Sequence, residues 1–289
     1  MFSKLWKNIL GKKPIVTNLL ILALCGANAF FVPRAMEVIS FGNTESLAVI
    51  LYHSVREDTA HCGKYVLSKE LFENDLIYLK ENGYQTVSVA MLYDFVNGNI
   101  TRLPEKSILL TFDDGCYNIY TYVLPLLREY GMRGVVCPVG EFTVNQNSEQ
   151  KIAYSYMNID QIRELYESGV FEIANHSYNM HGSPGRTGLV KINGESDEQF
   201  KLSVTEDLGK MQELLAGQGI ECRIFAYPYG IQNDLSRQAV NSMGFICSLS
   251  CEMGINELSR GSSLMDLKRY NRPHGSSSEE FFNGIFGNR

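Results

Sequence analysis

The feature that most constrains the fold is a repeated alternation, from Ser46 onward, between short apolar runs and segments with helical spacing. Such alternation predicts parallel strands joined by helices. The expected strands are Leu47–Tyr52, Gln85–Val87, Ile108–Phe112, Gly134–Pro138, Phe171–Ala174, Ile224–Tyr227 and Phe245–Leu249. About seven strands in about 250 residues favour a single closed or nearly closed β/α barrel, with chemistry at the carboxyl ends of the strands.

Two connecting segments carry clear helical signals. One is expected to begin with Ser68 as its N-cap and to end at Gly83, with apolar residues on one face between them. The other covers Val204 to Leu215, where apolar residues recur every three or four positions. Both apolar faces indicate core.

The first 36 residues differ from the rest of the chain. Their lysines are Lys4, Lys7, Lys12 and Lys13, followed by an uncharged stretch from Pro14 to Pro33. This charge order is typical of an export signal or of a signal-anchor helix inserted with its basic end inside. We therefore interpret residues 1–36 as a signal peptide or membrane anchor and residues 37–289 as one domain outside the cytoplasm. The segment Ala27–Ala29 fits a cleavage site, yet the apolar stretch nearly reaches the roughly 20 residues that span a membrane, so both outcomes stay open.

Charge and cysteine content argue against a nucleic-acid partner and against a metal site built from cysteines. The net charge is -6, and no long basic run follows the N-terminus, so a nucleic-acid partner is not expected. The seven cysteines contain no CxxC pair, which disfavours a metal site built from cysteines. Export permits disulfides, and the cysteine spacing leaves their presence open.

Two adjacent carboxylates end one of the expected strands. In SILLTFDDG, Asp113 and Asp114 precede Gly115, which allows the backbone to turn sharply. Buried together, the carboxylates would repel each other and one would take up a proton, unless a cation lay beside them. The pair therefore favours a cation site, and a solvated turn is the alternative.

Two of the five histidines follow another expected strand. His176 and His181 lie in FEIANHSYNMHG, and a spacing of five does not stack two side chains on one helix face. They would have to converge from a loop. With one carboxylate they would form an open three-ligand site for zinc or a similar divalent ion, with a position left for water.

A third strand end carries the segment Tyr227-Pro228-Tyr229-Gly230. There the backbone N–H of Tyr229 could point at a developing oxyanion, and the rings of Tyr227, Pro228 and Tyr229 could bind a sugar. By itself this segment indicates only a turn.

The three motifs, in this order and at these separations, resemble the polysaccharide deacetylase family (NodB-homology domain, carbohydrate esterase family 4) over roughly residues 46–275. The resemblance implies a distorted barrel of seven strands and makes residues 37–289 a catalytic domain. It implies that Asp113 is the general base and that Tyr229 helps to hold the oxyanion through its N–H. The metal ligands that it implies are Asp114, His176 and His181.

The chain departs from the family pattern in two ways. The histidine spacing is five rather than four, as in the subgroup that deacetylates poly-N-acetylglucosamine. Many members also have an arginine that tethers the base at the position where this chain has Ala226. Arg269 and Arg272 are the candidate substitutes, and the sequence does not choose between them.

The general acid has two candidates. In the same subgroup the acid comes from an early Tyr-His pair, which matches Tyr52-His53, whereas other members use a late motif, for which His274 is available. We favour His53, because it ends an apolar strand and would emerge at the same rim as Asp113.

The resemblance implies a metal-dependent hydrolase that removes N-acetyl groups from an N-acetylglucosamine polymer of cell wall or matrix and releases acetate. The expected metal is Zn²⁺, although Co²⁺, Ni²⁺ or Fe²⁺ also suits the ligands. A small-substrate amidase or esterase on the same barrel, or a non-catalytic carbohydrate-binding protein, are the alternatives. Which polymer is used, and the oligomeric state, stay open.

Overall fold

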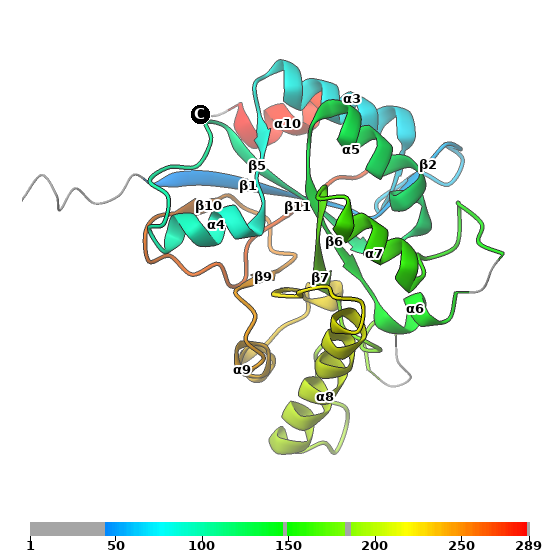
Figure 1. Cartoon of the computed structure of the whole chain (residues 1–289), viewed down its shortest axis with the longest axis vertical. Helices are drawn as coiled ribbons and strands as arrows, with labels where there is room; N and C mark the ends of the chain where they lie inside the picture. The colour runs from blue at the N-terminus through cyan, green and yellow to red at the C-terminus, as the bar shows by residue number, and fades with distance from the viewer. Residues whose placement is uncertain (1–43, 147–148, 183–185, 288–289) are drawn as a thin grey trace, which may run out of the picture. The chain divides into compact units, whose positions relative to one another are not determined.

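The computed structural model describes residues 44–146, 149–182 and 186–287 (Figure 1). The strands are β1 (Glu45–Tyr52), β2 (Ser54–Arg56), β3 (Val66–Ser68), β4 (Gln85–Thr86), β5 (Ser107–Asp114), β6 (Gly134–Pro138), β7 (Phe171–Asn175), β8 (Ile224–Ala226), β9 (Cys247–Leu249), β10 (Asn256–Leu258) and β11 (Tyr270–Asn271). The helices are α3 (Lys69–Glu81), α4 (Val89–Val96), α5 (Leu124–Tyr130), α6 (Gly140–Val144), α7 (Ile159–Glu167), α8 (Asp197–Ala216), α9 (Asp234–Ser242) and α10 (Ser278–Phe286). A π-helical turn, η1 (Ile119–Val123), leads into α5, and a 3₁₀ turn, η2 (Pro228–Gly230), follows β8.

One curled sheet organises the domain, with strand order β10-β1-β5-β6-β7-β8-β9. All neighbours from β1 to β9 are parallel, and only β10 is antiparallel to β1. Residues 267–271 link the two margins, because Leu267 pairs with β9 and β11 pairs with β1. The predicted α/β class is confirmed. The parallel arrangement brings the carboxyl ends of β1, β5, β7 and β8 to one rim.

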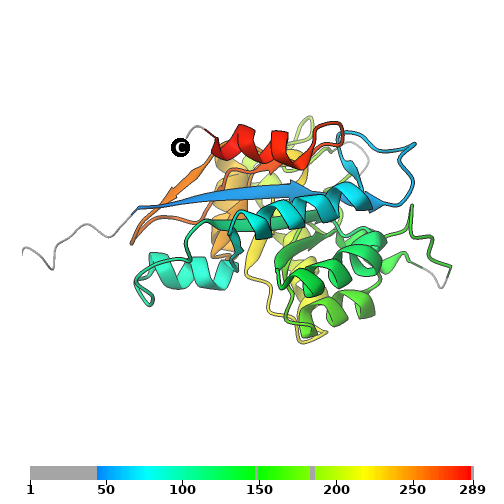
Figure 2. The same ribbon diagram turned by 90° about the horizontal axis from the view of Figure 1, so that it is seen from above.

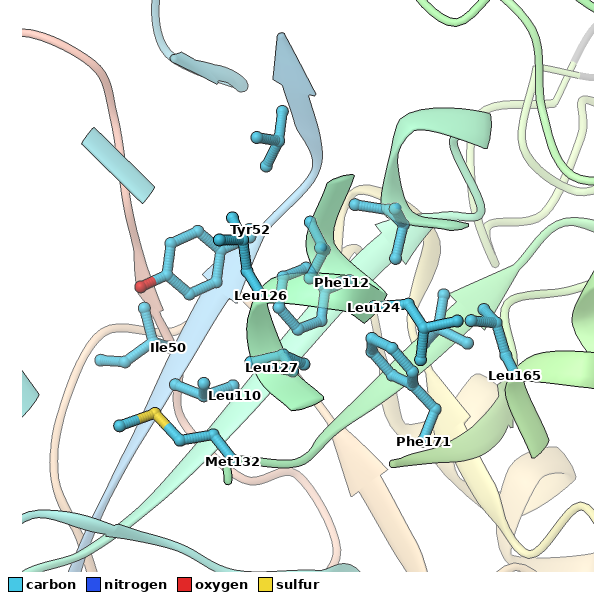
Figure 3. Packing of buried hydrophobic residues seen from close by; sticks show 14 of the residues in the cluster. Ile50, Tyr52, Leu110, Phe112, Leu124, Leu126, Leu127, Met132, Leu165 and Phe171 are labelled. Atoms are coloured by element: carbon cyan, nitrogen blue, oxygen red, sulfur yellow. The ribbon is translucent and has the colours of Figure 1, made fainter. Parts of the chain in front are cut away.

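Successive residues of the central strands pack into two different hydrophobic clusters, one on each face of the sheet. Ile108, Leu110 and Phe112 of β5 pack under the helices, whereas Leu109 belongs to a second cluster on the opposite face, together with α4. In the first cluster Phe112 stacks on Tyr52 at 5.2 Å and meets Phe171 edge-on at 5.7 Å (Figure 3). The same alternation places Asp113 on the face of Leu109, away from the cluster that contains Phe112.

The predicted elements are confirmed, with shifts at their ends. Ser68 caps α3 by accepting a hydrogen bond from the Leu71 amide, and α3 and α10 lie side by side (Figures 1 and 2). The strand expected at 85–87 is only two residues long, and the one expected at 245–249 begins at Cys247. Within the described residues no helix is long and apolar enough to cross a membrane. The signal or anchor predicted for residues 1–36 lies outside them.

Candidate active site at the strand ends

A cleft of about 500 Å³ opens at the rim where the parallel strands end. Its polar groups come from segments far apart in the sequence. His53 follows β1, the two aspartates end β5, the two histidines follow β7, and Tyr229 lies in η2. The lining residues are Leu51, His53, Lys64, Tyr65, Asp113, Asp114, His176, His181, Tyr229, Cys251, Met253, Arg269 and Asn271.

Asp114, His176 and His181 converge in this cleft, as the sequence predicts. Their ligand atoms lie within 4.8 Å of one another. The Nε2 atoms of His176 and His181 lie 3.7 and 3.2 Å from Asp114 Oδ1. His176 Nδ1 lies 2.8 Å from the Ala226 carbonyl oxygen, which can only accept, so this nitrogen donates and leaves the Nε2 lone pair facing the carboxylate.

The three residues have the donor set and the surroundings that suit a divalent cation. Asp114 Oδ1 is buried and accepts no well-formed hydrogen bond from the described residues, although two imidazole nitrogens surround it. Two imidazoles and one carboxylate favour zinc or a similar ion. The residues therefore fit the metal that the resemblance implies.

Left-handed backbone conformations occur at three non-glycine residues in or next to this site. Asp114, Ser177 and Tyr229 have φ values of 69°, 69° and 59°. Each such conformation costs a non-glycine residue of the order of 1–3 kcal/mol and persists only where the surroundings impose it. Gly115 follows at φ 73°, and a Cβ there would lie 2.9 Å from the Pro138 Cα. Glycine therefore allows β5 to turn tightly beside β6.

Asp113 lies beside these three residues but is bound by an arginine. Arg269 Nη1 and Nη2 donate to the two Asp113 carboxylate oxygens at 2.8 and 2.9 Å, and both side chains are almost fully buried. Burial alone would raise the pKa of Asp113, but the Arg269 cation outweighs it and holds that pKa well below its usual value. Asp113 is therefore an ionised, oriented acceptor at neutral pH.

The second arginine candidate is not in the cleft. Arg272 is buried on the other side of β11, where its Nε donates to Asp75 of α3 at 2.9 Å. Asp75 also accepts hydrogen bonds from Tyr52 and Ser278. This network joins α3 to α10, so the prediction that Arg272 could contact Asp113 is wrong and Arg269 makes that contact.

The two candidate acids are separated by the fold. His53 lines the cleft, packs against the Tyr65 ring at 4.8 Å, and has a buried Nδ1 without a hydrogen-bond partner among the described residues. Burial lowers the pKa of His53, against the pull of Asp113 and Asp114. His274 is absent from the cleft lining, and its backbone N–H donates to the Gly63 carbonyl.

In the Tyr-Pro-Tyr turn, Tyr229 lies in the cleft, whereas Tyr227 and Pro228 are buried. The Tyr229 ring is 49% exposed and stacks on His181 at 4.4 Å. Tyr227 is fully buried against Phe225, and Pro228 is also buried, so the expectation that their rings bind substrate is wrong. The reason is strand alternation, because Tyr227 falls on the same outer face as Phe225.

The sequence motifs missed several residues of the cleft wall. Tyr65 and Met253 are 49% and 70% exposed, although both are large and apolar, and Cys251 lies 3.7 Å from Arg269 Nη2. Asn271 donates to the Lys64 carbonyl oxygen at 2.9 Å. These residues come from loops or from the short β11 and have no periodic pattern that could have identified them.

Comparisons with known proteins agree with this geometry. The family model described as polysaccharide deacetylase matches residues 101–247, slightly more than half of the chain. The chain belongs to the polysaccharide deacetylase family. The match includes Asp113, Asp114 and both histidines, whereas His53 and Arg269 lie outside it.

Three members illustrate the range of similarity. A poly-β-1,6-N-acetyl-D-glucosamine N-deacetylase of Escherichia coli K12 is 26% identical over 247 residues, which are 78% of this chain and 36% of the relative. A Staphylococcus aureus protein of the same name is 24% identical over 197 residues, 65% of this chain and 62% of the relative. The chain therefore spans about a third of the length of the Escherichia coli relative and somewhat under two thirds of the length of the Staphylococcus aureus relative. The solved de-N-acetylase of Aggregatibacter actinomycetemcomitans superposes with a TM-score of 0.68 at 28% identity, covering 82% of this chain and all of that one.

Proposed function

We propose that this protein is a metal-dependent deacetylase that hydrolyses N-acetyl groups of an N-acetylglucosamine polymer and releases acetate. The observation that carries the proposal is the pairing of two different carboxylates at the end of β5. Asp114 faces two imidazoles, whereas Asp113, one residue earlier, is held by Arg269. A metal ligand and a general base would thus lie side by side in an accessible cleft, which is an arrangement that suits metal-assisted hydrolysis of an amide.

Each group in the cleft has a distinct role in this proposal. Asp114, His176 and His181 would hold the cation, which supplies Lewis acidity to the acetyl carbonyl and to the attacking water when bound. Asp113 accepts the proton of that water, because its carboxylate is ionised and fixed in orientation by Arg269. The Tyr229 N–H donates to the developing oxyanion.

The leaving amine requires a proton, and we assign its donor to His53. It is the one candidate acid that lines the cleft with Asp113. Donation at this position would release the amino sugar and acetate without any organic cofactor.

The proposed substrate rests on the relatives and on the cleft wall. The first relatives are named for poly-β-1,6-N-acetyl-D-glucosamine, and this chain has the five-residue histidine spacing of that subgroup. The exposed faces of Tyr65 and Tyr229 suit the apolar faces of sugar rings. We further propose Zn²⁺ as the metal, a distorted seven-stranded barrel closed by residues 267–271, and an extracytoplasmic location, either secreted or membrane-anchored, from the pattern of residues 1–36.

The test uses the purified full chain with poly-β-1,6-N-acetylglucosamine, chitin oligomers and peptidoglycan, and measures acetate. We expect acetate release that chelation abolishes and Zn²⁺ or Co²⁺ restores. Asp113→Asn should retain metal and lose turnover, which separates catalysis from metal-bound background hydrolysis. Release from small acetate esters but from none of the polymers would refute the proposed substrate class, and full activity without metal would refute the mechanism.

A further inference from the structure

The loop between the two histidines is held in an irregular conformation by hydrogen bonds from outside it. Residues 177–180 belong to no helix or strand, and Ser177 has a left-handed φ of 69°. Two of their carbonyl oxygens accept hydrogen bonds from the start of α6, at 3.1 Å from Gly140 N and 2.7 Å from Glu141 N. Neighbouring elements therefore help to determine the conformation of this loop.

A single carboxylate on α8 binds the middle of this loop. Asp207 Oδ1 accepts the Tyr178 N–H at 2.8 Å, and its Oδ2 accepts the Asn179 N–H at 2.8 Å. Hydrogen bonds to a charged acceptor contribute about 1.5–3 kcal/mol each. Next to it on the same helix, the Leu208 carbonyl oxygen accepts from the Asn175 side chain at 2.9 Å. Helix α8 is thus bonded to Asn175, the last residue of β7, and to Tyr178 and Asn179 beyond His176.

The spacing of the histidines makes this contact important for their geometry. Four residues lie between His176 and His181, yet the ring centroids of the two histidines lie 5.1 Å apart and both Nε2 atoms face Asp114. No regular element enforces that separation. The Asp207 carboxylate fixes the two amides midway between the histidines and so restrains one ring relative to the other, together with the α6 amides and the Met180 N–H that donates to Ser177 Oγ at 3.1 Å.

We propose that Asp207 is a positioning residue that sets the separation of His176 and His181 and thereby the affinity of the site for a divalent cation. This inference rests on the proposed metal-binding function. It goes beyond the motifs, because Asp207 lies on a helix outside all three of them and contacts neither histidine ring.

The experiment compares Asp207→Asn with Glu206→Gln by titrating the metal-free full-length protein with Zn²⁺. Asn replaces one acceptor oxygen by an NH₂ group, which cannot accept a backbone N–H. Glu206 is the matched control, because it is exposed, adjacent on α8 and of the same charge. We expect Asp207→Asn to weaken Zn²⁺ binding about 10–100-fold, the usual effect of losing a group that orients metal ligands. Glu206→Gln should stay within about twofold of wild type.

A second measurement separates positioning from a general loss of structure. In the metal-free protein, amide hydrogen exchange at Tyr178 and Asn179 should accelerate in Asp207→Asn while exchange in β5 stays unchanged. If Asp207→Asn does not fold, Asp207→Glu replaces it, since it keeps both oxygens but moves them by one methylene, and it should also bind Zn²⁺ more weakly. Equal Zn²⁺ affinity in wild type and in the folded Asp207 variant would overturn the inference. Absence of Zn²⁺ binding in wild type and Glu206→Gln would instead overturn the proposed function.

Discussion

Replacing Arg269 by Met should change both the stability of the protein and the pH dependence of its activity. The guanidinium and the Asp113 carboxylate form a two-bonded pair with side-chain exposures of 0% and 4%. Methionine has no charge, so Asp113 would remain buried without its cation. Removal of one partner of a buried ion pair costs about 3–5 kcal/mol, and we expect a loss of that size in the free energy of unfolding at neutral pH.

The sign of the pH effect follows from the same pair. In the wild type the pKa of Asp113 lies below that in the unfolded chain, so its stabilising contribution is present above about pH 4 and lost as the pH falls through the folded pKa. Without Arg269, burial dominates and the pKa of Asp113 rises above its usual value. The acid limb of the kcat/KM profile should therefore move to higher pH, and the lost stability should return as acidification protonates Asp113.

Arg272→Met is the matched control for this experiment. Arg272 belongs to the same segment and is equally buried, but its partner is Asp75 rather than Asp113. The Arg272→Met variant should lose a similar amount of stability, and the acid limb of its kcat/KM profile should be that of the wild type. For Arg269→Met we expect kcat/KM at neutral pH to fall about 10–100-fold, as for other residues that orient an active group. An unchanged acid limb in Arg269→Met, or an equal displacement in Arg272→Met, would contradict the assignment of Arg269.

Three further predictions concern the cleft and the core. His176→Ala and His181→Ala should lose bound metal, measured by elemental analysis, whereas Asp113→Asn should keep it; retention in the histidine variants would refute the ligand set. His53→Ala should lower kcat by about 10²–10⁴-fold and flatten the alkaline limb with metal content unchanged, while His274→Ala should cost much less. The opposite ranking would transfer the acid role to His274. Phe112→Ala should lower the free energy of unfolding by about 3–5 kcal/mol in urea titrations, because the ring is fully buried between Tyr52 and Phe171, and a loss below 1 kcal/mol would contradict that packing.

The central strands and the convergence of the motif residues could be predicted because the apolar runs that indicate the strands are long enough to be recognised in the sequence. β5 has eight residues, and its apolar run ends directly at the two aspartates. Parallel strands then place their carboxyl ends at one rim, independently of the conformation of the loops between them. The cleft wall could not be predicted in the same way. Tyr65 and Met253 come from connections whose course depends on tertiary contacts, and nothing in their spacing separates a cleft residue from a surface one.

Tyr227 was misplaced although the sequence contained the relevant signal. Ile224 and Ala226 belong to the inner cluster, and Phe225 and Tyr227 belong to the cluster packed against α8 and α9. Alternation along IFAY therefore already assigns Tyr227 to the outer face. The motif indicates that the turn is aromatic. The alternation of side chains along the strand determines that Tyr229, and not Tyr227, can reach the cleft.

The choice between Arg269 and Arg272 depends on the two-residue alternation of a strand that is too short for this alternation to be recognised in the sequence. In the parallel pairing of β11 with β1, Asn271 lies opposite Leu51, and both line the cleft. Odd-numbered positions of this segment therefore face inward, which brings Arg269 to Asp113, and even-numbered positions face the helices, which brings Arg272 to Asp75. With only two residues, β11 is too short to show alternation in the sequence, so the register with β1 had to be known first. Physical chemistry required a buried cation at Asp113, and the strand pairing at the closing margin of the sheet determined which arginine supplied it.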